Sequence, residues 1–158
     1  GEFCYELTVN NGALQVNFRA FVDRIDRIIE GNVLRIIDYK TGSVDMLPKG
    51  EELGVLFDKL GEGKYKAVLQ LYLYALICLE KKICAGELSG EVELVIYPLK
   101  KISKDGIASL KLEEEKLQTF KGLLVECVEE IFNREVPFYA NPQKKRCGYC
   151  SHAALCGR

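Results

Sequence analysis

The segment at residues 65–80 restricts the fold more than any other part of the chain. Its spacing predicts a helix, and apolar residues lie on nearly all of its sides. Such a helix is buried, because a solvent-facing helix would carry a polar side. Its apolar run, residues 67–79, contains Gln70 and is shorter than the roughly 20 residues that cross a bilayer. We therefore expect other elements to enclose this helix, and no membrane partner.

Strand patterns precede this helix, and a strand and a second helix follow it. Alternating or β-branched runs predict strands at residues 4–9, 14–29, 33–40 and 91–99, and helical spacing predicts a long helix at 112–133. Glycines and prolines predict a long loop at 41–63 and a turn at Asn10-Asn11-Gly12. The order predicts an α/β fold, a small mixed sheet flanked by helices with an irregular cysteine-containing tail.

Length and composition fit one domain with its own core. The chain has 158 residues, 48% of them hydrophobic and 28% charged. Its net charge of −1 argues against a stand-alone DNA-binding protein and suits an enzyme with acidic metal ligands. The seven cysteines and the lack of a signal peptide predict a cytoplasmic protein without a disulfide framework. We expect a core at residues 1–136 and a cysteine-cluster tail at 137–158 that packs on it.

Two acids and a lysine share one face of a predicted hairpin. If its turn is centred on Gly31-Asn32, Asp23 lies opposite Lys40, and opposing residues share a face. Asp38 lies on the same face, because side chains two apart in a strand point the same way. The rest of this face is mostly apolar and should pack inward. A turn longer by one residue would move Asp23 to the other face.

Carboxylates on an inward-facing surface need compensation, because unpaired buried charge is costly. Carboxylate oxygens suit Mg²⁺ or Mn²⁺, which activate water and offset the charge that develops in phosphodiester hydrolysis. Lys40 could then position the water or stabilise that charge. The alternative is a buried Asp–Lys ion pair without a metal ion.

The sequence around these residues resembles the PD-(D/E)XK nuclease superfamily. Residues 21–26 (FVDRID) and 36–42 (IIDYKTG) are most similar to its RecB/AddB-type exonuclease branch, and residues 70–74 (QLYLY) resemble the QxxxY motif of that branch. The resemblance implies a restriction-endonuclease-like fold. It also implies Asp23, Asp38 and the backbone carbonyl of Tyr39 as metal ligands, Lys40 as the catalytic lysine, and Gln70 and Tyr74 as active-site residues.

Some features stand outside that pattern. Tyr74 lies one helical turn after Gln70 on the same side, although a glutamine that only satisfies a loop carbonyl is the alternative. Arg24 and Asp26 fall on the opposite face and are expected to be structural. The family usually has glycine where this chain has Ala20, and members usually carry an upstream helix that completes the metal site. We therefore expect a fragment lacking that helix, and the resemblance leaves open a weakly active or inactive protein.

Three cysteines near the end, Cys147, Cys150 and Cys156, have a metal-ligand spacing. Relatives of the AddB type carry a similar trio, which an upstream cysteine joins to hold a [4Fe–4S] cluster, so the resemblance implies such a cluster in the full-length protein. The alternatives are a zinc site that includes His152, and unligated cysteines.

The resemblance implies a metal-dependent DNA exonuclease domain. It would hydrolyse single-stranded DNA or duplex ends in the bacterial cytoplasm, as part of a helicase–nuclease or a DNA-end-processing repair protein with a helicase domain or subunit. The alternative functions are a catalytically inactive nuclease fold that binds DNA or a partner, and a zinc-tailed scaffold whose acids are structural. We expect Lys40→Ala to abolish cleavage with little loss of stability.

Overall fold

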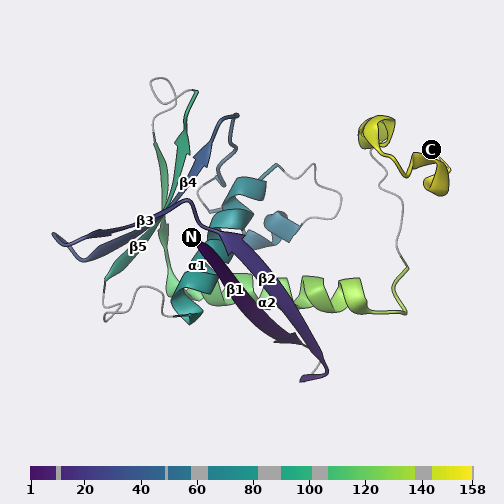
Figure 1. Ribbon diagram of the computed structural model, residues 1–158, viewed down its shortest axis with the longest axis horizontal. Coiled ribbons are helices and arrows are strands. Elements are labelled where there is room, and N and C mark those ends of the chain that lie inside the picture. The colour runs from purple at the N-terminus through teal and green to yellow at the C-terminus, as the bar shows by residue number, and fades with distance from the viewer. Residues whose placement is uncertain are drawn as a thin grey trace.

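The computed structural model of this chain describes residues 1–9, 12–48, 50–57, 64–81, 90–100, 107–137 and 144–157. They form two β-sheets and two α-helices (Figure 1). The strands are β1 (Glu2–Val9), β2 (Leu14–Phe21), β3 (Arg24–Ile28), β4 (Val33–Lys40), β5 (Glu91–Pro98) and β6 (Ala108–Leu112). The helices are α1 (Lys66–Glu80) and α2 (Glu114–Phe132), with short 3-10 turns η2 (Leu53–Phe57), η3 (Lys144–Tyr149) and η4 (Ala153–Cys156).

The larger sheet is mixed, as predicted, with the strand order β3-β4-β5-β6. Its central pair, β4 and β5, is parallel, and the outer pairs are antiparallel. Parallel neighbours need a crossover, and α1 supplies it by lying against β4 and β5 on one face of the sheet (Figure 1). The hairpin β1–β2 and α2 pack on α1 from the other side. This enclosure confirms the buried helix, whose Val68, Leu71 and Ile77 are fully buried.

The register of the β3–β4 hairpin differs from the predicted one by two residues. The last ladder pair is Ile28 with Val33, so the turn has four residues, and Asn32 N–H donates to the carbonyl of Ile29. This register sets Ile25 opposite Ile36 and Asp26 opposite Arg35, pairing apolar with apolar and acid with base. The predicted register is wrong. Because the shift is even, every side chain keeps its predicted face.

The turn of this hairpin lies directly against the start of β5. A Cβ atom placed on Gly90 would lie 1.8 Å from the backbone oxygen of Asn32, so only glycine fits there. Asn32 itself has a positive φ of 50° and Gly31 one of 87°. The close approach aligns Val33 with Glu91, the first pair of the parallel ladder.

Several elements differ from the sequence prediction. The long strand predicted at residues 14–29 is two strands, β2 and β3, separated at Val22 and Asp23. Strand β6 was not predicted, and α2 begins two residues after the predicted start. The predicted loop at 41–63 contains η2, whose Leu53 is buried, while residues 49 and 58–63 of that loop lie outside the described residues. So do Asn10 and Asn11 of the predicted turn.

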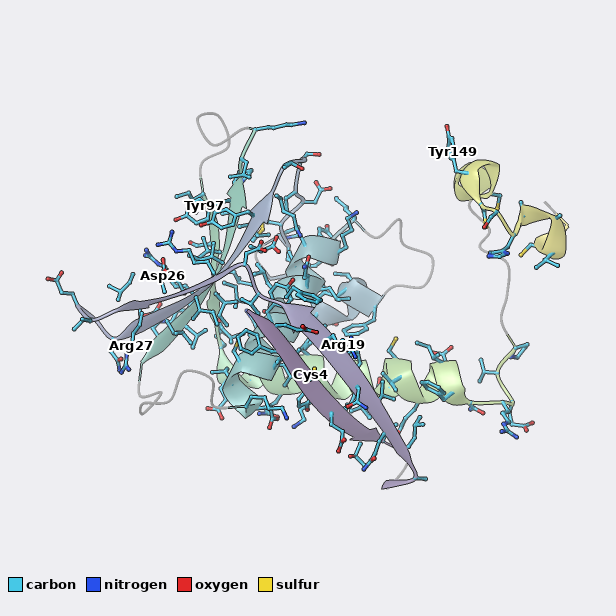
Figure 2. The ribbon with its side chains drawn as sticks, viewed as in Figure 1. Cys4, Arg19, Asp26, Arg27, Tyr97 and Tyr149 are labelled. Carbon is cyan, nitrogen blue, oxygen red and sulfur yellow. The ribbon has the colours of Figure 1, made fainter. Side chains whose placement is uncertain are left out.

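The turns η3 and η4 lie apart from the sheets and helices (Figure 1). Tyr149 is 97% exposed and points away from the rest of the chain (Figure 2). The packing of residues 137–158 on the core, and the domain boundary at 136, stay predictions. Among the described residues, neither helix is both long and apolar enough to cross a bilayer.

Candidate active site

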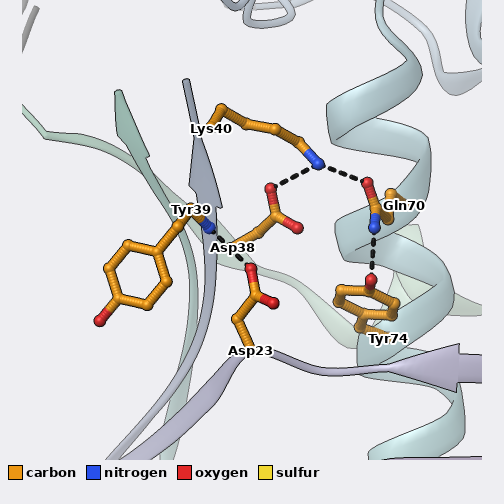
Figure 3. A network of polar contacts seen from close by, with 6 residues as sticks. All are labelled: Asp23, Asp38, Tyr39, Lys40, Gln70 and Tyr74. Atoms are coloured by element: carbon orange, nitrogen blue, oxygen red, sulfur yellow. Dashed lines mark hydrogen bonds and ion pairs between the residues drawn. The ribbon is translucent and has the colours of Figure 1, made fainter. Parts of the chain in front are cut away.

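The carboxyl end of β4 extends past its neighbour and leaves part of its edge without a partner strand. The antiparallel ladder with β3 ends at Arg24 and Ile37, whereas the parallel ladder with β5 continues to Lys40. Asp23 lies just before β3, at the break from β2. Its Oδ2 accepts a hydrogen bond of 2.9 Å from the backbone N–H of Tyr39 (Figure 3). The side chain of Asp23 therefore replaces the missing strand partner and lies beside Asp38.

Asp38 is the buried acid of this group, with 2% of its surface exposed. Burial raises the pKa of its carboxyl group, the nearby Lys40 ammonium group opposes the rise, and the negative charge of Asp23 adds to it. The Nζ of Lys40 lies 2.8 Å from Oδ2 of Asp38. That oxygen makes no hydrogen bond of ordinary geometry with the described residues. Among the described residues, the Lys40 ammonium group is the cation that offsets the charge of this carboxylate.

Helix α1 supplies the second polar contact of Lys40. The Nζ of Lys40 donates a hydrogen bond of 2.7 Å to Oε1 of Gln70. An ammonium group can only donate, so this contact fixes which way the Gln70 amide points. Its Nε2 therefore donates to the hydroxyl of Tyr74, one turn along the helix (Figure 3). With its oxygen accepting that bond, Tyr74 has its own proton free to donate elsewhere.

Tyr74 faces the two acids from the helix side. Its side chain is buried, and burial raises the pKa of its hydroxyl group. The Gln70 hydrogen bond opposes this rise, while the charges of Asp38 and Asp23 add to it. The hydroxyl group of Tyr74 is therefore protonated at neutral pH and lies in the field of both carboxylates. The five predicted catalytic side chains form one continuous group: Asp23, Asp38, Lys40, Gln70 and Tyr74 (Figure 3).

Sequence reasoning missed one contact of this group, the hydrogen bond from Tyr39 N–H to Asp23. It depends on the start of β3 at Arg24, which the sequence prediction placed inside one long strand. On the opposite face, Arg24 and Asp26 form an ion pair of 2.7 Å, in keeping with their expected structural role.

The group fits a divalent cation. Asp23 and Asp38 bring two carboxylates together, and Oδ2 of Asp38 is buried without a hydrogen bond to the described residues. Such an oxygen is a suitable ligand for Mg²⁺ or Mn²⁺. Two acids alone are an incomplete set, and no three described His, Cys, Asp or Glu side chains form a group that could hold a metal ion. Backbone oxygen or water would have to complete the coordination.

The predicted cysteine ligands do not form such a group either. Cys147 lies in η3, Cys150 follows it and Cys156 ends η4. All three are free thiols on a segment remote from β4 and α1 (Figure 1). The described part of the tail therefore holds no group of three such ligands.

Comparison with known proteins agrees with this geometry. A family model described as the PD-(D/E)XK nuclease superfamily matches residues 2–157, nearly the whole chain. No curated protein and no solved structure gives a significant match. Nucleases of this superfamily generally use divalent metal ions, and their fold implies DNA as a substrate. The chain belongs to the PD-(D/E)XK nuclease superfamily.

Proposed function

We propose that this chain is a metal-dependent DNA exonuclease domain of the RecB/AddB type, with its active site at the carboxyl end of β4. The observation that carries the proposal is the position of Asp38. It is a buried acid beside a second acid, and a lysine provides its only described compensation. Burying Asp38 beside the negative charge of the exposed Asp23 costs stability, and a divalent cation held by the two acids would offset that cost.

Asp23 and Asp38 would hold the cation, and the backbone carbonyl of Tyr39 is the third ligand. In a strand, the N–H and C=O groups of one residue point to the same side. Tyr39 N–H points to Asp23, so its carbonyl points to the same open edge. The carbonyl of Lys40 points the other way and accepts the N–H of Leu99. The cation, when bound, would activate water and offset negative charge on the phosphate.

The remaining side chains act on the phosphate and the attacking water. Of the three donor hydrogens of Lys40, Gln70 accepts one in a hydrogen bond, and the ammonium group also pairs with the charge of Asp38. A remaining hydrogen can contact a phosphate oxygen or the attacking water. Gln70 holds the ammonium group in place, and Tyr74 fixes the amide of Gln70. The free hydroxyl proton of Tyr74 can donate to a second phosphate oxygen, where negative charge grows as the bond to the leaving group breaks.

The exonuclease assignment and the cellular setting rest on the motif strings. Residues 21–26, 36–42 and 70–74 resemble those of RecB/AddB-type enzymes in order and spacing. We accordingly propose a role in DNA-end processing in the bacterial cytoplasm, together with a helicase domain or subunit.

Linear and circular single-stranded DNA separate exonuclease from endonuclease action. With Mn²⁺, the wild type should shorten end-labelled linear DNA to nucleotides or short products and leave a circle of the same sequence intact. The Asp23→Asn variant keeps the shape of the side chain but removes its negative charge. It should cut neither the linear nor the circular DNA. Cutting of the circle would replace the exonuclease assignment with an endonuclease one. An inactive wild type would favour the non-catalytic binding module.

We also propose that Cys147, Cys150 and Cys156 ligate a [4Fe–4S] cluster together with a fourth thiolate, after the tail has rearranged. The spacing of the three thiols supports this proposal. Protein purified without oxygen should contain iron and sulfide, and Cys150→Ser should lose both. Zinc in place of iron, lost in Cys150→Ser and in His152→Ala, would support the zinc alternative.

A further inference from the structure

The open edge of β4 joins two different surfaces of the sheet. Beyond Ile37 no strand among the described residues pairs with β4 on the β3 side. Side chains alternate along it, so Asp38 and Lys40 point toward α1 while Tyr39 points to the opposite face (Figure 3). A strand of nucleic acid that crosses this edge can place a phosphate on one side and a base on the other.

On the opposite face, Tyr39 belongs to an ordered aromatic pair. Its ring lies against that of Tyr97 on β5, with centroids 5.6 Å apart and planes tilted by 50°. The parallel register sets the two residues side by side. The guanidinium group of Arg24, which donates to Asp26, lies near the Tyr39 hydroxyl group. Contacts from two neighbouring strands therefore hold the ring in one orientation.

This aromatic pair is accessible. Tyr39 is 36% exposed, and no described helix lies over this face of the sheet (Figure 1). Tyr97 and Asp26 lie on the side turned away from α1 (Figure 2). Ordered aromatic side chains that remain open to solvent next to a phosphate-cleaving site suit a flat, apolar ligand group.

The charges of this face do not favour a phosphate there. Three cationic side chains described on its strands are paired with acids, in the ion pairs Arg24–Asp26 (2.7 Å), Arg35–Glu93 (2.6 Å) and Lys111–Glu91 (2.9 Å). The face therefore offers aromatic surface without excess positive charge. Nucleobases stack on such surface whatever their sequence, because every base has a π-face.

We propose that Tyr39, supported by Tyr97, is a stacking platform for an unpaired base of the DNA strand whose phosphate lies at Asp23 and Asp38. The inference rests on the proposed function and specifies its substrate as single-stranded DNA. Tyr39 directly follows Asp38 along β4 and its side chain points to the opposite face, so the platform lies across the strand edge from the two acids. A base held in a duplex is paired and stacked on its neighbours, so it is unavailable to the platform.

An abasic site tests the platform during cleavage. Two single-stranded oligonucleotides, one intact and one lacking a single base next to the terminal phosphodiester, are compared by kcat/KM in Mn²⁺. Stacking of one base predicts a preference of roughly 5- to 150-fold for the intact strand. Tyr39→Leu should reduce this ratio to near one, Tyr39→Phe should retain it, and Tyr149→Leu serves as the matched exposed-tyrosine control. An equal ratio in Tyr39→Leu and the wild type would overturn the proposal.

A binding measurement keeps this test separate from the proposed function. A 2-aminopurine placed at the same position loses fluorescence when it stacks, and Ca²⁺ can replace Mn²⁺ because no cleavage is required. Quenching by the wild type and Tyr39→Phe, but not by Tyr39→Leu, supports the platform even if the chain cuts no DNA. If the wild type cleaves DNA and Tyr39→Leu quenches the fluorescence as strongly as the wild type, the proposed nuclease function is retained and the stacking platform is refuted.

Discussion

Replacing Lys40 with alanine should destabilise the protein in the absence of metal ions, in addition to stopping cleavage. The sequence alone suggested little loss of stability. In the structure, however, Lys40 Nζ lies 2.8 Å from a carboxylate that is 2% exposed. Alanine would leave Asp38 buried with Asp23 nearby and no cation to offset the two charges.

The expected cost follows from how deeply this ion pair is buried. Breaking a fully buried pair costs about 3–5 kcal/mol, and an exposed pair contributes about 0–1 kcal/mol. The Lys40 side chain is 28% exposed and that of Asp38 is 2% exposed, so this pair lies between the two limits. We expect a loss of about 1–3 kcal/mol in the free energy of unfolding. For a protein of this size, the melting temperature would fall by roughly 2–12 °C.

Thermal unfolding in EDTA measures this loss of stability. The measurement is made at pH 8 because a lower pH would favour protonation of Asp38, which removes the unpaired charge. The same substitution is then made in Asp38→Asn, which lacks the buried charge, to complete a double-mutant cycle. Lys40→Ala should cost much less in that background. Equal costs in both backgrounds would show that Lys40 does not compensate Asp38, and would refute the reasoning.

Three further predictions concern the metal site and the core. Mn²⁺ at one hundred times its dissociation constant should stabilise the wild type by about 2.7 kcal/mol, and Asp38→Asn should show a much smaller shift in melting temperature. In EDTA, folded Asp38 holds its proton to higher pH than unfolded Asp38. The free energy of unfolding of the wild type, compared with that of Asp38→Asn, should therefore fall as the pH rises from the ordinary pKa of 3.8 through the raised pKa of folded Asp38. Denaturant titrations at several pH values measure this difference, and an increase over that pH range would contradict the prediction. Phe120 is fully buried against Tyr72 and Phe57. Its replacement by alanine should lower the free energy of unfolding by about 3–5 kcal/mol, as measured by urea unfolding.

The part of the site that could be predicted depends on parity. Asp38 and Lys40 share a face because they are two residues apart in a strand, and no choice of turn can separate them. Asp23 needed the correct turn parity as well. The observed register keeps it because the four-residue turn shifts the ladder by an even number. The group was therefore predictable as a set of side chains on one face.

The geometry of the open edge could not be read from the sequence. The apolar alternation of β2 ends at Val22 and resumes at Ile25 in the opposite phase, and the sequence prediction of one long strand passed over this break beside Asp23. Strand β6 is short and pairs with β5 across an intervening segment, and a ladder of this kind is decided by tertiary packing. The ring of Tyr39 packs against that of Tyr97, which lies far along the chain. The parallel pairing of β4 and β5 brings the two residues side by side.

Cleavage of end-labelled single-stranded DNA with Mn²⁺ tests the central claim most directly, by comparing the wild type with Lys40→Ala at a temperature where both are folded. The account predicts metal-dependent cutting by the wild type, none in EDTA, and a loss of cutting in Lys40→Ala. Cutting by Lys40→Ala at the wild-type rate would contradict the assignment of the active site to the carboxyl end of β4.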